Sequence, residues 1–132
     1  MKVLVEKKIL VVGLNGMARK LLDLPARIKF VKNGVKAVSS FKNEKFDGVI
    51  SRWNLDDMAD GGLIRGIKLI KPDLPVVSVV NSGSIDEEIS SRAVGVNAVV
   101  TDKSSDVLLS EIICGILGMS VPSKTLNSVR TK

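Results

Sequence analysis

The residues of this sequence that could take part in chemistry follow apolar segments typical of buried strands. Gly13-Leu14-Asn15-Gly16 comes directly after the apolar run KILVV, where glycines can open a nucleotide-binding loop. The segment lacks the third glycine of a G-x-G-x-x-G loop, and the next apolar segment leads to Lys32 instead of an acid for a ribose. We therefore interpret it as a tight turn into a helix.

Two adjacent carboxylates, Asp56 and Asp57, follow a third apolar segment, GVISRW. They are placed to approach a functional crevice, but acids in a loop before a helix more often face solvent or cap a helix. The same segment ends in Arg52 and Trp53, and these residue types are frequent anchors of protein interfaces. In the alternative interpretation, Arg52 pairs with Asp102 or with one of the two loop carboxylates. Trp53 then packs on its own loop.

The polar segment Asn81-Ser82-Gly83-Ser84 follows the strongest apolar run, VVSVV, and leads into a helix. Backbone N–H groups at such a place can hold an anion, although a plain helix cap is the favoured interpretation. Ser84 and Glu87 have the spacing of a capping box, which supports a helix start here.

The remaining composition argues against most catalytic chemistry. The chain has no histidine and no tyrosine, and no cluster of acids lies at the expected strand ends. Acid–base catalysis and a metal site are therefore not expected. Cys114 is the only cysteine, which excludes an internal disulfide, and its apolar neighbours predict an inert buried thiol. We expect no enzymatic turnover and no cofactor.

Charge is distributed unevenly along the chain. Residues 1–45 hold 11 Lys/Arg and 3 Asp/Glu, whereas residues 46–119 hold 6 and 11. This pattern suggests a charged docking face or head-to-tail self-association, with ordinary solvated charge as the alternative. No nucleic-acid-binding motif or aromatic stacking platform accompanies the lysines, so specific nucleic-acid binding is not expected.

No segment of the sequence has the features of a membrane span or of a signal peptide. The apolar run at residues 9–12 is far too short to cross a bilayer, and charged residues break up the segment before it. We therefore expect no membrane association and a cytoplasmic location.

Strand and helix patterns alternate along the chain. Short runs rich in Val, Ile and Leu predict strands at residues 8–12, 28–31, 48–53, 76–80 and 98–101. Helical spacing and capping residues predict helices at residues 16–24, 35–44, 63–70, 84–94 and 105–117. Such units with right-handed crossovers form a doubly wound parallel α/β sheet, whose ligand crevice lies at the carboxyl ends of the strands.

The chain resembles a response-regulator receiver (CheY-like) domain in the order and spacing of these segments. The resemblance is best across residues 33–70, NGVKAVSSFKNEKFDGVISRWNLDDMADGGLIRGIKLI, and extends to KILVV, PDLPVVSVVNSG and AVGVNAVV. It implies a flavodoxin-like fold over residues 1–119: a doubly wound five-stranded parallel sheet of strand order 2-1-3-4-5 with flanking helices. Residues 120–132 then form a basic, flexible tail. The predicted helix at residues 16–24 is several residues shorter than the family's first helix.

By this resemblance, the family's phosphoacceptor aspartate falls on Arg52, and the acidic pair that holds Mg²⁺ falls on Gly13 and Leu14. Mg²⁺ needs hard oxygen ligands, which Gly and Leu side chains do not supply. A guanidinium about 4 Å away repels the ion by about 8 kcal/mol at an effective dielectric constant of about 20. Arginine also stays protonated and is no nucleophile. The resemblance therefore implies a degenerate site without aspartyl phosphorylation.

Two further positions of the family's switch are altered in this sequence. The hydroxyl residue that ends the family's fourth strand falls on Val80, with Ser82 close by. The lysine that follows the fifth strand falls on Asp102, with Lys103 adjacent. A one-residue shift that brings Lys103 to the lysine position is the alternative alignment there.

These features predict a pseudo-receiver, a non-catalytic module of two-component signalling that acts by protein–protein interaction. The family resemblance places its output or homodimer face at about residues 85–117. Candidate interaction residues are Arg52, Trp53, Asp56 and Asp57.

Two alternatives remain open. The first is a small-ligand or anion sensor that uses the altered crevice around Gly13, Arg52 and Ser82. The second is a receiver that is phosphorylated on a displaced acid, Asp56 or Asp57.

Overall fold

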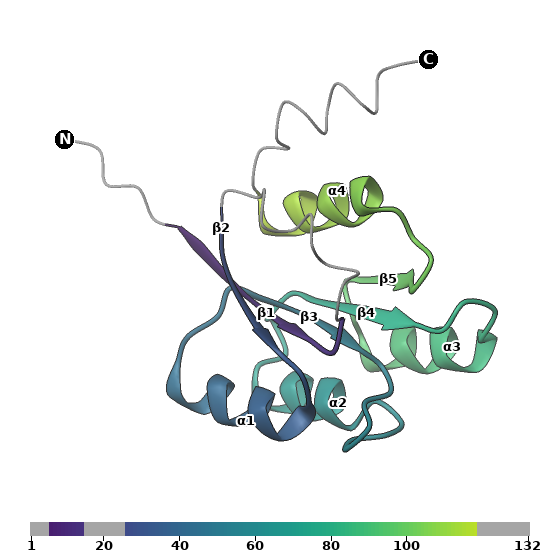
Figure 1. Cartoon of the computed structure of the whole chain (residues 1–132), viewed down its shortest axis with the longest axis horizontal. Helices are drawn as coiled ribbons and strands as arrows, with labels where there is room; N and C mark the ends of the chain where they lie inside the picture. Colours follow the sequence, from purple (N-terminus) through teal and green to yellow (C-terminus); the bar gives the residue numbers. More distant parts are fainter. Residues whose placement is uncertain (1–5, 15–25, 119–132) are drawn as a thin grey trace, which may run out of the picture.

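The computed structural model describes residues 6–14 and 26–118, and within them five strands alternate with four helices (Figure 1). The strands are β1 (Lys7–Val12), β2 (Ala26–Val31), β3 (Gly48–Arg52), β4 (Val76–Val80) and β5 (Ala98–Thr101). The helices are α1 (Gly34–Asn43), α2 (Gly62–Ile70), α3 (Ile85–Val94) and α4 (Asp106–Leu117). Each of these elements lies where the sequence predicts it, with small shifts at the ends. The predicted helix at residues 16–24 and the tail at residues 120–132 lie outside the described residues.

The strands form one parallel sheet in the order β2-β1-β3-β4-β5, which confirms the predicted fold class. Val12 at the end of β1 lies opposite Val31 of β2 and Ser51 of β3. Val80 at the end of β4 lies opposite Thr101 of β5. The carboxyl ends of the strands therefore lie along one edge of the sheet, and the loops that follow them form a common surface.

Helices cover both faces of the sheet, with α1, α2 and α3 on one face and α4 on the other (Figure 1). Side chains alternate between the two faces along each strand. In β1, Leu10 and Val12 join the core below α1 and α2, whereas Ile9 and Val11 join the core below α4. Because both faces are covered, the central strands β1, β3 and β4 are largely continuous apolar runs, whereas the edge strand β2 also contains Arg27 and Lys29.

The start of α3 differs in one detail from the predicted capping box. The Ser84 hydroxyl accepts a hydrogen bond from the N–H of Glu87, as predicted. The Glu87 carboxylate does not return to the backbone of Ser84; it accepts hydrogen bonds from the backbone and side-chain N–H groups of Asn81, at 3.2 and 3.1 Å. Glu87 therefore ties the loop after β4 to the first turn of α3.

Helix α3 places polar side chains toward the sheet and large apolar side chains toward solvent, which is the reverse of most helices that pack on a sheet. On the inner side, Ser91 and Ser78 of β4 are both fully buried, and their hydroxyl oxygens lie 2.8 Å apart. On the outer side, Ile85 and Ile89 are 70% and 60% exposed. Leu108 of α4 is also exposed, at 44%, so it does not join the apolar side of this helix that packs on the sheet.

The core below α4 contains Cys114, which is buried as predicted. Burial raises the pKa of the Cys114 thiol, because a thiolate is poorly solvated among apolar side chains. Among the residues that the structure describes, no helix has the length and apolar character needed to cross a membrane.

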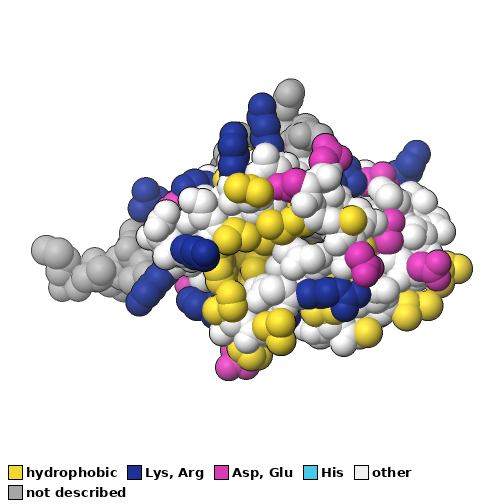
Figure 2. All heavy atoms as spheres, turned by 90° about the horizontal axis from the view of Figure 1, so that it is seen from below, with side chains coloured by type: hydrophobic (Ala, Val, Ile, Leu, Met, Phe, Trp, Pro, Cys, Tyr) yellow, Lys and Arg dark blue, Asp and Glu magenta, His cyan; other side chains and the backbone are white. Residues whose placement is uncertain are grey.

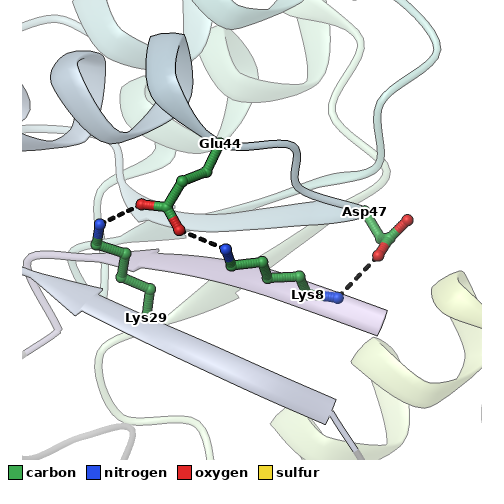
Figure 3. A network of polar contacts seen from close by, with 4 residues as sticks. All are labelled: Lys8, Lys29, Glu44 and Asp47. Atoms are coloured by element: carbon green, nitrogen blue, oxygen red, sulfur yellow. Dashed lines mark hydrogen bonds and ion pairs between the residues drawn. The ribbon is translucent and has the colours of Figure 1, made fainter. Parts of the chain in front are cut away.

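A polar network joins the C-terminal end of α1 to the first two strands (Figure 3). The two carboxylate oxygens of Glu44 accept hydrogen bonds from the ammonium groups of Lys8 on β1 and Lys29 on β2. The backbone N–H of Lys8 donates to the Asp47 carboxylate at 2.8 Å. The hydrogen bonds from Lys29 and Lys8 lower the pKa of Glu44 from its ordinary value of 4.5 to about 2.

We expect the free energy of unfolding of the Glu44→Gln variant to fall less steeply with decreasing pH than that of the unmodified protein. Because the folded state lowers the pKa of Glu44, its carboxylate stabilises the fold above pH 4.5, and this contribution is lost as the pH falls to about 2. Urea unfolding at a series of pH values measures the effect. The two proteins should differ most near neutral pH and converge at the acid end. Parallel pH profiles over the whole range would contradict the role of the network.

Candidate functional site

The side chain of Arg52 lies at the carboxyl edge of the sheet and bridges β3 to the end of β1. Its Nε–H donates a hydrogen bond to the backbone carbonyl of Gly13 at 2.9 Å. Gly13 has a left-handed backbone with φ of +72°, and its own N–H bonds the carbonyl of Val31 at 3.0 Å. The guanidinium is thus held against the backbone at the end of β1, and its hydrogen bond goes to a carbonyl and not to a carboxylate.

The alternative interpretation from the sequence, in which Arg52 pairs with a nearby acid, does not agree with the structure. Among the described residues, Arg52 forms no ion pair, and two of the three candidate carboxylates have other partners. The carboxylate of Asp57 accepts hydrogen bonds from the N–H groups of Gly34 and Val35 at 2.8 and 2.9 Å. The carboxylate of Asp102 accepts one from the N–H of Ser82 at 2.9 Å.

Asp57 acts as a cap for a helix distant in sequence. Its two carboxylate oxygens bind the first N–H groups of α1, where the helix dipole favours negative charge. These two backbone hydrogen bonds lower the pKa of Asp57, which keeps the group ionised. Asp57 therefore caps a helix, as the sequence suggested for the loop acids, but the helix is α1 and not the following helix α2.

Asp56 lies beside Arg52 in an open hollow of about 410 Å³ at the strand ends. The hollow contains two cations and one carboxylate, and its lining residues are Gly13, Lys32, Arg52, Asn54, Leu55 and Asp56. Ser82, which the anion-sensor alternative includes, is not among them. In residues 6–14 and 26–118, no group of three or more His, Cys, Asp or Glu side chains gathers to hold a metal ion.

The indole of Trp53 is buried, with 2% of its surface exposed, so it is not available as an interface anchor. It packs on its own loop, which was the alternative interpretation from the sequence. The backbone carbonyl of Trp53 accepts from the N–H of Gly61, and the guanidinium of Arg65 stacks 5.1 Å from its ring centre. This closure was not predicted from the sequence. The signal that could have indicated it is the Asp60-Gly61-Gly62 segment, since such segments favour turns, and Asp60 and Gly61 have left-handed backbones.

The remaining positions of the predicted degenerate site are apolar or engaged in loop contacts. Leu14 is 2% exposed and belongs to the core below α4, and Val80 is buried at the end of β4. The bond between Asp102 and the Ser82 N–H joins the loops that follow β5 and β4. Lys103 is exposed, and its backbone N–H donates to the Thr101 hydroxyl at 3.2 Å. None of these side chains lines the hollow beside Arg52.

The chain has the flavodoxin-like fold of response-regulator receiver domains. A CheY-like response regulator receiver domain protein from Methanospirillum hungatei superposes with a TM-score of 0.78 at 17% identity, covering 94% of this chain and 99% of that one. The signal receiver domain of an HD domain-containing protein from Pseudomonas fluorescens gives 0.78 at 18% identity, covering 86% and 96%.

The chemotaxis response regulator CheY4 of Vibrio cholerae is a third protein with this fold. It superposes with a TM-score of 0.74 at 16% identity, covering 85% of this chain and 99% of that chain. No protein-family model matches the sequence, and no curated protein matches it. The structural likeness therefore identifies the fold, and the activity has to be argued from the residues of this chain.

Proposed function

We propose that this chain is a pseudo-receiver, a signalling module that acts through protein contacts without aspartyl phosphorylation. The observation that supports this most is the hydrogen bond from Arg52 to the carbonyl of Gly13. This hydrogen bond holds a permanent positive charge against the end of β1. By the sequence resemblance, Arg52 aligns with the family's phosphoacceptor, and the end of β1 aligns with the family's Mg²⁺ site. Arginine has no nucleophilic oxygen to accept a phosphoryl group, and its charge repels the metal that the reaction needs.

The two positions of the family's acidic pair support the same proposal. Leu14 is packed into the core, and Gly13 has no side chain, so neither supplies an oxygen ligand from its side chain. Mg²⁺ sheds its water reluctantly and is bound through carboxylates and phosphates. Asp56 is the only carboxylate that lines the hollow beside Arg52 in the described part of the chain.

Phosphorylation on a displaced acid is the weaker alternative. Both oxygens of Asp57 accept hydrogen bonds from the start of α1, so its attack on a phosphoryl donor would break the cap. Asp56 is exposed and lines the hollow, but it lies next to Arg52 and has no second acid beside it there. This alternative therefore rests on Asp56.

The partners that we propose are proteins of a signalling pathway, bound through the region of residues 85–117. This region includes the exposed isoleucines of α3 and the exposed Leu108 of α4, which lie on opposite sides of the sheet. Exposed aliphatic side chains of this size favour a protein partner over a nucleic acid. A cytoplasmic location and a flexible tail at residues 120–132 stay predictions from the sequence.

The proposal predicts that the protein does not bind a phosphoryl mimic at the strand ends. We expect no specific amide shifts at residues 52–57 and 80–84 when the full chain is titrated with Mg²⁺ and then with beryllofluoride, an acyl-phosphate mimic. An intact receiver domain run under the same conditions is the positive control. Saturable shifts at these residues would contradict the proposal, and their loss in Asp56→Asn would identify the displaced acid.

An anion sensor is a second candidate function because two cations, Lys32 and Arg52, line the open hollow. Opposing it, Asp56 lines the same hollow and repels an anion. Titration with inorganic phosphate separates this candidate from a receiver, since it requires no Mg²⁺. Shifts around Gly13 and Arg52 that disappear in Arg52→Ala would support the sensor, and their absence in the unmodified protein would exclude it.

A further inference from the structure

The layer formed by α1, α2 and α3 exposes more large aliphatic side chains than solvated helices usually do. The exposed fractions are 64% for Val35, 84% for Leu69, 69% for Ile70, 70% for Ile85 and 60% for Ile89. Figure 2, which views the molecule from the side of these three helices, shows hydrophobic side chains gathered across the surface. Large exposed patches of this kind mark interaction sites on soluble domains. We call this surface the three-helix face.

An apolar groove of about 160 Å³ lies between α1 and α2 on the three-helix face. The residues that line it are Val38, Phe41, Lys42, Met58, Gly62, Leu63, Gly66, Ile67 and Ile70. Gly66 leaves the space open, since a Cβ added there would meet no atom within 4 Å. The groove is therefore a hollow into which aliphatic side chains of a partner can insert.

The rim of the groove is basic. Lys42 lines the groove, and the ammonium of Lys71 lies 5.7 Å from the ring centre of Phe41, which also lines it. Neither α1 nor α2 contains an aspartate or glutamate. A partner that fits this groove therefore combines apolar side chains with acidic neighbours.

Helix α3 has the complementary features. Ile85 and Ile89 are one helical turn apart, so they lie on the same side of the helix and point away from the buried Ser91. Asp86 and Glu88 flank this isoleucine pair, and both residues are exposed. The Glu88 carboxylate also pairs with the guanidinium of Arg92, one turn further along α3, at 3.2 Å. The α3 surface thus offers two aliphatic side chains between two acids, which is the chemistry that the groove requires.

We propose that a second copy of this chain occupies the three-helix face. The isoleucine pair of each copy enters the groove between α1 and α2 of the other copy, with Asp86 and Glu88 facing Lys42 and Lys71. The groove and α3 lie on the same layer with α2 between them, so one two-fold axis near the exposed Leu69 satisfies both contacts. Such an isologous arrangement closes the assembly at two copies.

Two features of the face favour a second copy over an unrelated partner. The face carries both the apolar-basic groove and the apolar-acidic helix, so it is complementary to itself. A two-fold arrangement also uses each contact twice, which doubles the apolar surface that is buried. The inference is independent of whether the chain is phosphorylated.

Sedimentation velocity on the full chain over a range of concentrations tests this proposal. We expect a dimer whose dissociation constant rises by about thirtyfold in Ile89→Asp, because a charge replaces a central apolar anchor. Leu108→Asp is the matched control, since Leu108 is exposed on α4 at the opposite side of the sheet. A chain that stays monomeric at the highest concentration would overturn the proposal, as would a dimer that Leu108→Asp disrupts and Ile89→Asp does not.

A charge exchange tests the pairing itself without relying on an apolar substitution. One variant carries Lys42→Glu and Lys71→Glu, and the other carries Asp86→Lys and Glu88→Lys. Each variant alone should dimerise about tenfold more weakly than the unmodified chain, since each faces like charges across the interface. An equimolar mixture should restore the dimer, because both contacts of the mixed pair then join opposite charges. Variants that dimerise as well alone as in the mixture would refute the assignment of the face.

Discussion

Replacement of Trp53 by alanine should lower the free energy of unfolding by about 4 kcal/mol, because it removes a large buried ring and leaves a cavity. The ring belongs to the core below α1 and α2, and only 2% of its surface is exposed. It also supports the stacked guanidinium of Arg65. A domain of this size has only about 5–15 kcal/mol of total stability, so the variant should be close to unfolding.

Urea unfolding followed by far-ultraviolet circular dichroism measures this loss, since the substitution removes the only tryptophan of the chain and with it the fluorescence probe. Trp53→Phe is the matched control, because it keeps an aromatic ring in the same space. It should cost about half as much as the alanine variant. If Trp53→Ala cost less than about 1 kcal/mol, as surface substitutions do, the ring would be an exposed side chain and its interface role would be open again.

Gly61→Ala should lower the free energy of unfolding by about 3 kcal/mol, from two causes that act at the same residue. Gly61 has φ of +69°, a conformation that L side chains adopt at a cost. A Cβ at this position would also lie 2.2 Å from the nearest ring carbon of Trp53, so the indole would have to move. Fluorescence of Trp53 reports both the unfolding and any displacement of the ring.

Two other glycines separate the two causes. Gly83 also has a left-handed backbone, with φ of +86°, but a Cβ there would meet no atom within 4 Å, so Gly83→Ala should cost only about 1 kcal/mol. Gly66 lies inside α2 with open space around it, and Gly66→Ala should stabilise the protein by about 1 kcal/mol. Equal losses for Gly61→Ala and Gly83→Ala would show that the contact with Trp53 contributes nothing.

The fold could be predicted from the sequence because its signals are local. Segments such as VVSVV combine β-branched residues with a proline before them and a glycine-containing turn after them, which few other structures tolerate. Asn33, Ser84 and Ser105 cap three of the helices through their own side chains, so the helix starts could be located to within about one residue. The parallel pairing of the strands follows from right-handed crossovers, and the strand order was implied by the family resemblance.

The contacts of the site could not be predicted because their partners are distant in sequence. Arg52 and Gly13 are 39 positions apart, and the acceptor is a backbone carbonyl that no residue type announces. The partners of Asp57 are N–H groups of α1, which depend on how the loop before α2 lies against that helix. The sequence suggested side-chain partners for Arg52 and helix capping for the loop acids, but neither the Gly13 carbonyl nor the start of α1 could be named as the partner.

The burial of Trp53 and the exposure of Ile85 have a similar explanation. From residue type alone, Trp53 was a candidate for an exposed interface anchor, and an isoleucine such as Ile85 is expected in the core. The loop that closes on Gly61 covers the indole, and the buried pair of Ser78 and Ser91 places the isoleucines of α3 on the outside. The burial of Trp53 and the exposure of Ile85 therefore depend on how the helices, strands and loops pack together.

The backbone of Gly13 makes an acidic side chain difficult to introduce at the end of β1. An aspartate at this position would have to adopt φ of +72°, and its Cβ would lie 2.7 Å from Cδ2 of the buried Leu55. Such a codon change alone would weaken the fold while Arg52 still occupied the neighbouring position. Under the proposed function, a phosphorylatable site in this chain would therefore need several coordinated substitutions, because an acid at position 13 brings strain and a clash with Leu55.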